Sequence, residues 1–271
     1  MPELPEVETT RRGIEPWLNG KIVEKGTVRQ RQLRWPVPRR LDRELPGQQV
    51  LRVGRRAKYL LVETARGTLI IHLGMSGSLR VLGDRPAPGN HDHVDLELSS
   101  GRMLRFNDPR RFGALLWTTR DPLKHPLLRE LGPEPLGPQF GGYVLYRAAR
   151  GRRVAIKNFI MNARVVVGVG NIYASEALFR AGIHPTRAAG RVSRGRMERL
   201  ADAIRAVLSD ALEAGGTTLR DFTWGDGQPG YFAQQLQVYD RAGLPCPACS
   251  GPVRRRVIGQ RSTFFCAACQ H

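Results

Sequence analysis

The spacing of hydrophobic residues divides the chain into stretches of different character. In residues 2–19, hydrophobic side chains recur at helical spacing on one face and Gly20 follows them, which predicts an N-terminal helix. Residues 21–118 instead hold short β-rich runs separated by turn signals, a pattern typical of a β-sandwich or barrel. The predicted strands are 49–53, 59–63, 68–72, 93–98, 103–106 and 114–117.

The second half of the chain has a helical pattern. Proline and glycine between Leu131 and Pro138 mark the boundary. The clearest helix is 193–214, with Ser193 as a candidate cap and two glycines after its last turn. A glycine-rich stretch then leads to a tail that contains all four cysteines. We therefore predict an α+β chain with three domains, 2–130, 131–235 and 236–271.

Composition indicates a polyanion as the binding partner. The chain has 43 Lys and Arg against 24 Asp and Glu, a formal net charge of +19, and the basic residues are spread through its length. We expect a folded basic surface that binds nucleic acid rather than a disordered basic arm. The apolar runs are too short to span a bilayer and no signal-peptide pattern is present, so we expect a soluble, cytoplasmic protein.

Only five of the basic residues are lysines. Arginine supplies a fixed charge nearly anywhere, whereas lysine can transfer a proton once its surroundings lower its pKa. A lysine retained in such an arginine-rich chain is a candidate for proton transfer, which singles out Lys58 and Lys157. Lys58 also stands where a basic turn enters a strand, so a solvated strand end is the alternative interpretation.

The four cysteines give the most specific signal. They form the pattern Cys246-x2-Cys249-x16-Cys266-x2-Cys269, which matches a zinc site built from two turns joined by a β-hairpin. Two disulfides are the alternative, although a cytosolic chain is kept reduced. Because four thiolates leave no coordination position open, we expect one structural zinc ion. The arginines between the two pairs would let such a hairpin grip phosphate; they are Arg254, Arg255, Arg256 and Arg261.

The first residues carry candidate covalent chemistry. If Met1 is removed, Pro2 offers a free secondary amine, and a chain-terminal amine with a pKa of roughly 7.7–8 is partly unprotonated near neutral pH. Its attack on an aldehyde-like carbon gives a cationic iminium, an electron sink that makes an adjacent proton acidic. Glu3 lies beside Pro2 and Glu6 follows one helical turn later. The alternative is that Pro2 and Pro5 only start a helix.

Two loops between predicted strands carry candidate contact residues. Met75 stands between two glycines, and Phe112 stands between an arginine and a glycine. Both look like exposed apolar tips, although either could belong to the core. Near them, His91 and His93 could form a metal pair, but they alternate along a strand and lack further obvious ligands.

A third loop precedes a predicted helix. Gly168 and Gly170 form a tight turn, Asn171 could cap the helix, and the N–H groups at the helix start favour an anion. A plain helix cap is the common explanation of such a pattern. Dinucleotide binding is disfavoured, because the third glycine and the surrounding βαβ unit are missing.

Taken in order, these motifs resemble those of the bacterial formamidopyrimidine-DNA glycosylases. The likeness runs from Pro2 to Gln270; its motifs are 1–13, 55–61, 72–78, 107–113, 165–176 and the cysteine tail. It implies an N-terminal catalytic β-sandwich domain, a helix-two-turns-helix domain and a zinc-finger hairpin. It also implies a monomeric repair enzyme that removes oxidised purines, chiefly 8-oxoguanine opposite cytosine and formamidopyrimidines, from duplex DNA and cuts the abasic site.

The resemblance assigns the chemistry to individual residues. Pro2 would attack the anomeric sugar carbon, with Glu3 as general acid and base, Glu6 in support and Lys58 as proton donor. The base leaves, and β- and δ-elimination then cut both flanking phosphates. The finger-tip residue Arg261 is assigned the last elimination. Because a guanidinium scarcely gives up its proton, we expect Arg261 to hold the departing phosphate.

The resemblance also assigns DNA contacts. The residues concerned are His91, Arg110, Arg152, Asn171, Met75 and Phe112. An enzyme that extrudes a base must fill the gap, and apolar wedges such as Met75 and Phe112 can do so, while Arg110 can read the orphaned partner base. The glycine-rich loop 215–232 would close over the flipped base. Two departures are minor: Arg152 replaces a common lysine, and 161–164 differs from the usual acidic stretch.

Two rival interpretations remain. An endonuclease VIII-type enzyme for oxidised pyrimidines would share the proline, glutamate, lysine and zinc finger, but its usual opening has glycine where Leu4 stands, and it lacks the Met75 and Arg110–Phe112 context. A non-catalytic damaged-DNA-binding protein would keep the fold, but intact Pro2, Glu3 and Lys58 argue against it.

Overall fold

The computed structural model describes residues 2–216 and 235–271. These residues fall into two compact units, one formed by 2–129 with 215–216 and the other by 130–214 together with 235–271. Each unit has its own hydrophobic interior. None of the helices within these described ranges is long and apolar enough to cross a membrane.

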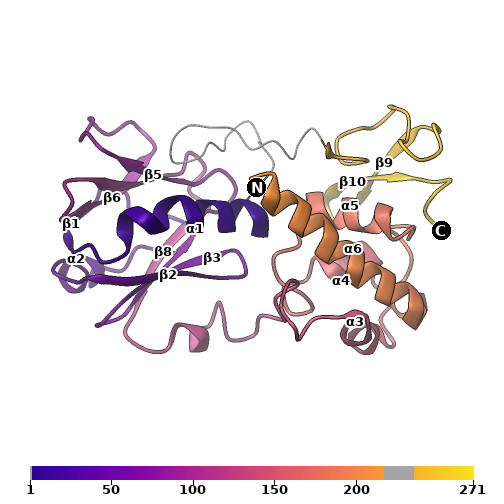
Figure 1. Cartoon of the computed structure of the whole chain (residues 1–271), viewed down its shortest axis with the longest axis horizontal. Helices are drawn as coiled ribbons and strands as arrows, with labels where there is room; N and C mark the ends of the chain where they lie inside the picture. The colour runs from indigo at the N-terminus through magenta and orange to yellow at the C-terminus, as the bar shows by residue number, and fades with distance from the viewer. Residues whose placement is uncertain (1, 217–234) are drawn as a thin grey trace. The chain divides into compact units, whose positions relative to one another are not determined.

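The first unit is a β-sandwich (Figure 1). Its strands are β1 (Val23–Val28), β2 (Val50–Arg56), β3 (Tyr59–Thr64), β4 (Thr68–His72), β5 (Ser78–Leu82), β6 (Asp92–Leu98), β7 (Met103–Asn107) and β8 (Ala114–Thr118). One antiparallel sheet has the order β1-β6-β7-β5 and the other β2-β3-β4-β8. The inward-facing side chains of both sheets form one core, for example Leu96 and Phe106 from the first sheet with Val62 and Ile71 from the second. The predicted β-sandwich is thus confirmed.

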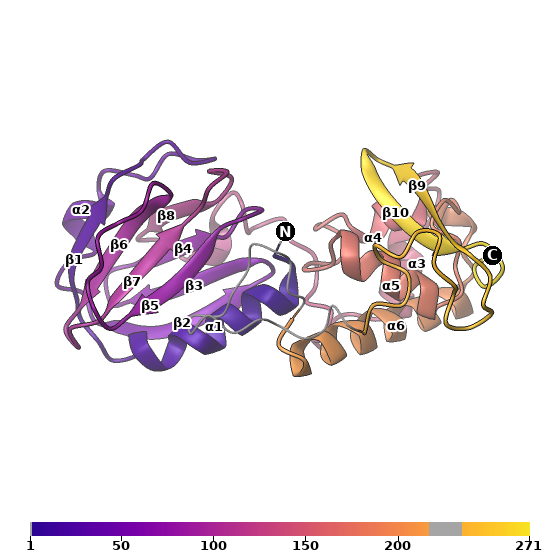
Figure 2. The ribbon, with the colours of Figure 1, turned by 90° about the horizontal axis from the view of Figure 1, so that it is seen from above.

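Two helices complete this unit. The predicted N-terminal helix is α1 (Leu4–Leu18), and its Val7, Ile14 and Leu18 join the sandwich core. It packs against β2 and β5, which are edge strands of different sheets, so one amphipathic helix covers an open side of the sandwich (Figure 2). The short helix α2 (Leu41–Glu44) packs against β1.

The six predicted strands correspond to β2, β3, β4, β6, β7 and β8 within a few residues. The sequence pattern missed β1 and β5, and both lie at the edges of the same sheet. Edge strands are half exposed and tolerate polar residues, so they lack a clear hydrophobic alternation. In β1, five of the six residues are partly or fully exposed.

The second unit is mainly helical and ends in a β-hairpin (Figure 2). Its elements are α3 (Gly142–Ala149), α4 (Ile156–Ile160), α5 (Asn171–Arg180), α6 (Arg194–Glu213), β9 (Val253–Ile258) and β10 (Arg261–Cys266), with 3-10 turns at Pro122–Lys124 in the first unit and Ala189–Arg191 here. The predicted helix 193–214 is α6, which packs on α3 and α5. Ser193 occupies its N-cap position, but the serine side chain makes no capping hydrogen bond.

Candidate functional site

The start of α1 places two carboxylates beside Pro2. Pro2 is buried, and Glu3 and Glu6 are each only 1% exposed. Glu3 is the N-cap residue with an extended backbone, and its N–H donates to Glu6 Oε2 over 2.8 Å. This hydrogen bond fixes the peptide that joins Pro2 to Glu3, because the acceptor belongs to the first turn of the same helix.

Lys58 lies in the two-residue turn between β2 and β3, and its side chain is partly buried. Its neighbour Ala57 has a φ of 56°, which a tight hairpin turn requires at one of its central residues. Arg55 ties this turn to α1: one nitrogen donates to the Ala57 carbonyl over 2.8 Å and another to Glu8 over 3.0 Å. The turn that carries Lys58 is therefore held to the helix that begins beside Pro2.

The ion pairs of Glu8 keep that link charged. Burial works to raise the pKa of Glu8, but hydrogen bonds and the positive charges of Arg11 and Arg55 outweigh burial, so the pKa lies below its ordinary value. Glu8 stays ionised at neutral pH as a result. The link between α1 and the Lys58 turn is then a charge-assisted one.

Next to Lys58, His72 is held as a neutral base. It ends β4 opposite Tyr59, with ring centroids 4.8 Å apart, and its Nδ1 accepts the Gly74 N–H over 3.0 Å. Burial, followed by the positive charges of Lys58 and Arg34, lowers the pKa of His72 to about 4. An uncharged imidazole thus joins the Lys58 turn to the base of the Met75 loop.

Two expected contact loops lie against each other. The loop of Met75 joins β4 to β5, and the loop of Arg110 and Phe112 joins β7 to β8. A Cβ atom on Gly74 would lie 2.5 Å from Gly113 N and from the Phe112 carbonyl carbon, so the two backbones touch. Met75 is 38% and Phe112 41% exposed, and the Arg110 guanidinium lies 4.9 Å from the Phe112 ring centre. Both apolar side chains are therefore surface tips.

His91 belongs to the same cluster of loops. It is exposed just before β6, and its carbonyl accepts the Asp108 N–H over 3.0 Å. The neighbouring Asp92 is buried and accepts hydrogen bonds from Asn107 and the Gly89 N–H, each 2.8 Å. Burial works to raise the pKa of Asp92, but these bonds and nearby arginines lower it below the ordinary value. His93 does not form a metal pair, because its Nε2 bonds the Asp108 carbonyl oxygen over 2.8 Å.

In the second unit, Asn171 is the first residue of α5 rather than its cap; the cap position is Gly170. The Asn171 side chain instead accepts a hydrogen bond from Lys157 Nζ over 2.6 Å and donates to the Ser262 carbonyl over 3.0 Å. Lys157 is fully buried, and its ammonium also donates to Thr263 Oγ1 over 2.7 Å and to Ser262 O over 3.2 Å. The ammonium thus joins α4, the start of α5 and the hairpin.

The hairpin tip presents Arg261 to solvent. Gly259 and Gln260 form the turn with φ values of 56° and 63°, and Arg261 is the exposed first residue of β10. A Cβ on Gly259 would lie 2.5 Å from the Asn158 side chain, so the turn rests directly on α4. The backbone on either side of Arg261 is therefore fixed while its guanidinium is available.

Arg152 is exposed in the turn before α4. Its Nε donates to the Ala148 carbonyl at the end of α3 over 2.8 Å. The guanidinium lies 5.8 Å from the Phe159 ring centre. Its charge is thus presented beside α4 in the same unit as Asn171 and Arg261.

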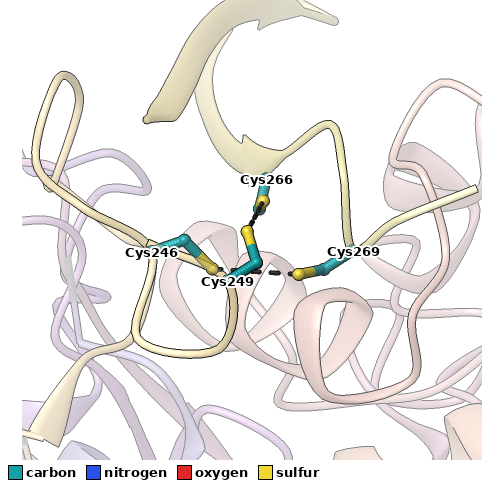
Figure 3. Close-up of side chains that lie close together, drawn as sticks. All are labelled: Cys246, Cys249, Cys266 and Cys269. Atoms are coloured by element: carbon teal, nitrogen blue, oxygen red, sulfur yellow. Dashed lines mark hydrogen bonds between the residues drawn. The ribbon is translucent and has the colours of Figure 1, made fainter. Parts of the chain in front are cut away.

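The four cysteines converge from two turns (Figure 3). Their sulfur atoms all lie within 4.8 Å of one another, with Cys246 and Cys269 at 3.9 Å and Cys249 and Cys266 at 3.5 Å. A disulfide needs about 2.05 Å, whereas a tetrahedral ion with Zn–S bonds of about 2.3 Å places its ligands about 3.8 Å apart. The thiols therefore fit a single tetrahedral zinc ion. Among the described residues, no other group of three or more metal-binding side chains occurs.

The loop anchors were not found from the sequence. Asp108 and Ser76 are buried and hydrogen-bonded to each other, and Arg55 joins the Lys58 turn to α1. A short Asn-Asp-Pro segment usually indicates an ordinary turn, so nothing in the pattern distinguishes Asp108. The expected closing loop, 215–232, lies outside the described residues except for its first two glycines.

The structure combines a β-sandwich that begins beside two buried carboxylates with a helical unit bonded to a four-cysteine hairpin, and this combination defines a zinc-finger protein. Three family models cover most of the chain. They are the formamidopyrimidine-DNA glycosylase N-terminal domain over 1–115, the formamidopyrimidine-DNA glycosylase H2TH domain over 131–223, and the zinc finger found in FPG and IleRS over 243–271. The chain belongs to the formamidopyrimidine-DNA glycosylase family, and it contains that family's one structural zinc site.

Whole-chain relatives agree with this assignment. The formamidopyrimidine-DNA glycosylases of Syntrophotalea carbinolica and Alkalilimnicola ehrlichii are 61% and 60% identical over the full length of both chains. The crystal structure of MutM (Fpg) from Thermus thermophilus matches with a TM-score of 0.90 at 41% identity, covering 99% of this chain and 98% of that one. Lactococcus lactis Fpg in complex with abasic-site DNA matches with a TM-score of 0.92 at 30% identity, covering 99% of both chains.

Proposed function

We propose that this protein is a DNA glycosylase and abasic-site lyase that removes oxidised purines from duplex DNA. The observation that carries the proposal is Pro2 at the start of α1 with two buried carboxylates, Glu3 and Glu6, fixed beside it. Relatives support the substrate class: Lactococcus lactis Fpg has been solved with DNA containing Fapy-dG and with an abasic site, and a MutM with DNA containing carbocyclic 8-oxo-G.

The chemistry begins once Met1 has been removed. The Pro2 nitrogen attacks the anomeric carbon of the damaged nucleotide, the bond from that carbon to the base breaks, and the base leaves with a proton. Glu3 exchanges protons with the sugar oxygen as the ring opens to the iminium. Glu6 holds the Glu3 backbone in place. Lys58, whose turn is held to α1 through Arg55, would give a proton to the sugar oxygen or to a phosphate.

Strand cleavage follows from the iminium. It acidifies the neighbouring sugar proton, so β-elimination expels one phosphate and δ-elimination expels the other. Release of the sugar fragment by hydrolysis returns the free Pro2 amine. Arg261 on its rigid hairpin is suited to bind a departing phosphate rather than to transfer a proton, because a guanidinium stays charged.

DNA recognition is divided between the two units. In the first unit Met75 and Phe112 would fill the space left by the extruded base and Arg110 would read its former partner, while His91 contacts the backbone. In the second unit Asn171, Arg152 and Arg261 would hold phosphates. Because the substrate is chromosomal DNA, we place the protein in the cytoplasm at the nucleoid, acting as a monomer on the double helix.

Borohydride trapping tests the function and its rivals. The mature protein is incubated with duplexes that carry either 8-oxoguanine opposite cytosine or thymine glycol, and borohydride reduces any iminium to a stable adduct. Trapping on the first duplex supports the proposal. Trapping chiefly on thymine glycol supports an endonuclease VIII-type enzyme, and binding without trapping supports a non-catalytic protein.

Two variants locate the nucleophile. Blocking the terminus, by acetylation or by retaining Met1, is expected to abolish the adduct. Pro5→Ala is the matched control, because it removes a proline from the first turn of the same helix without touching the terminal nitrogen. A blocked terminus that still cleaves damaged duplex at full speed would overturn the assignment of Pro2.

A further inference from the structure

Asp108 lies at the centre of the loops that carry the expected wedge and reader residues. Its side chain is fully buried. Oδ1 accepts a hydrogen bond from Ser76 Oγ over 2.9 Å, and Oδ2 accepts the Gly113 N–H over 2.7 Å. Within the part of the chain that the structure describes, no ion pair neutralises this carboxylate. Burying a carboxylate is costly unless it is well hydrogen-bonded, so the two bonds hold the side chain firmly.

The partners of Asp108 adjoin the exposed tips. Ser76 follows Met75, and Gly113 follows Phe112. The Ser76 hydroxyl donates to Asp108 and accepts the Arg110 N–H over 3.3 Å. One buried carboxylate is thus bonded to the Ser76 hydroxyl beside Met75 and to the Gly113 N–H beside Phe112, and through Ser76 it is connected to the N–H of Arg110.

The backbone of Asp108 fixes the base of the same cluster. Its N–H donates to the His91 carbonyl over 3.0 Å, and its carbonyl oxygen bonds His93 Nε2 over 2.8 Å. The preceding Asn107 is bonded to Asp92 over 2.8 Å. The residue that joins the two loops is therefore itself anchored to β6.

Close packing leaves the loops no room to slide past each other. A Cβ on Gly113 would lie 2.6 Å from the Phe106 ring and 2.8 Å from the His72 carbonyl oxygen. Gly74, with a φ of 67°, leaves equally little space on the opposite side. Both contacts require glycine, and together with the Asp108 bonds they make the loops one rigid body.

We propose that Asp108 is a positioning residue that couples the Met75 loop to the Arg110–Phe112 loop, so that filling the gap and reading the opposite base occur as one step. This inference rests on the proposed function. If the loops moved independently, Met75 could occupy the gap while Arg110 failed to meet the partner base. With Asp108 in place, extrusion of a base and inspection of its partner are linked.

The test measures excision of 8-oxoguanine opposite cytosine and opposite adenine by single-turnover kinetics. Ser76→Ala breaks the relay from Arg110 to Asp108 and leaves the Asp108–Gly113 bond. It is expected to reduce the cytosine-to-adenine preference about fivefold, the factor that one neutral hydrogen bond supplies. Asp108→Asn replaces one of the two acceptor oxygens with an NH2 group, which then faces either the Gly113 N–H or the Ser76 hydroxyl. This variant is expected to reduce the cytosine-to-adenine preference further. Ser99→Ala is the matched control, because it removes a serine hydroxyl that accepts one backbone hydrogen bond in the β6–β7 turn.

A second readout separates coupling from general damage. A fluorescent base analogue placed beside the lesion reports unstacking by stopped flow, and the assay runs well below the melting temperature of each variant. Coupling predicts that Ser76→Ala slows unstacking and lowers kcat more than it raises KM. Excision with wild-type preference and wild-type unstacking by Ser76→Ala would overturn the proposal. Absence of trapping by the wild-type protein on any damaged duplex would instead refute the proposed function itself.

Discussion

Lys157 Nζ and Asn171 Oδ1 lie 2.6 Å apart, and the lysine side chain is completely buried. The same ammonium holds Thr263 and the Ser262 carbonyl of the hairpin. The presence of lysine rather than arginine at this position, in an arginine-rich chain, thus has a structural explanation. A compact ammonium with three donors fits three converging acceptors. A guanidinium is larger and planar, so it would direct its N–H groups differently from an ammonium at this position.

Replacing this ammonium is expected to loosen the hairpin. Lys157→Met keeps the length of the side chain but removes the charge and its hydrogen bonds, and it should lower the free energy of unfolding by about 2 kcal/mol. Urea denaturation measures the loss. Lys124→Met, at an exposed lysine, is the control. Equal stability of the two variants would mean that the buried ammonium is not a structural link.

Zinc removal is expected to damage more than the hairpin. Phe179 of α5 shares a small core with Val253 and Phe264 of the hairpin, so loss of the ion exposes apolar surface on both elements. The binding free energy of a structural zinc site is on the order of 10 kcal/mol. Cys249→Ser should therefore lower zinc content and the melting temperature together, whereas the neighbouring Ser250→Ala should change neither. A Cys249→Ser protein that melts like the wild type would argue against a structural role for the ion.

Acid is expected to weaken the first unit through His72. Its pKa is about 4 in the folded chain and near 6.5 when unfolded, so the unfolded state binds the proton first. The stabilisation is complete above pH 6.5 and is lost as the pH falls towards 4. It amounts to roughly 3 kcal/mol at most, at 1.36 kcal/mol per pH unit. Thermal melting between pH 4 and 7 should show a shallower slope for His72→Asn than for the wild type.

A suitable control for that experiment is His91→Asn, which changes an exposed ring. Its melting profile should follow the wild type through the same pH range. The carboxylates Glu8, Asp92 and Asp95 also have lowered pKa values, because hydrogen bonds and arginines outweigh the effect of burial. Protonation of these carboxylates also lowers the stability of the fold as the pH falls, but at lower pH. This loss of stability should remain in both variants.

The finger-tip arginine is expected to matter for the second elimination. Arg261→Gln removes a charge-assisted phosphate contact, so the product of β-elimination should accumulate and the δ-elimination product should form at least about tenfold more slowly. Denaturing gels resolve the two products. Arg254→Gln, at an exposed arginine on β9, tests whether any hairpin charge suffices. Identical product ratios for both variants would contradict a specific role for Arg261.

The sequence predicted the helices and strands in which a buried face requires apolar residues at regular spacing. Strands such as β4 and β8 are filled with apolar residues and end on a polar one, so their limits were found closely. Strand β1 has a glycine and two charged residues among its six, and it forms only because β6 offers it a row of backbone partners. Such a strand depends on its neighbour rather than on its own side chains.

Site residues could be predicted from the sequence where the chemistry permits only certain residue types. They were missed where their role depends on contacts that form only in the folded chain. Four cysteines at zinc spacing admit few explanations, and they converge as expected. The local pattern allows Asn171 to cap a helix, because asparagine is a favoured N-cap residue. Its actual bond runs to a lysine 14 positions earlier and to a hairpin carbonyl 91 positions later, and contacts at such separations leave no local pattern.

The placement of α1 across the edges of both sheets has a consequence for how the enzyme would fail. Chain termini ordinarily fray before the rest of a protein opens. Here the first residues start a helix whose apolar face belongs to the central core, so the end that carries Pro2 stays ordered for as long as the strands beneath it do. Mutations deep inside the sandwich, remote from any nucleotide, should thus lower the temperature at which covalent chemistry is lost, because that loss coincides with the opening of the sandwich itself.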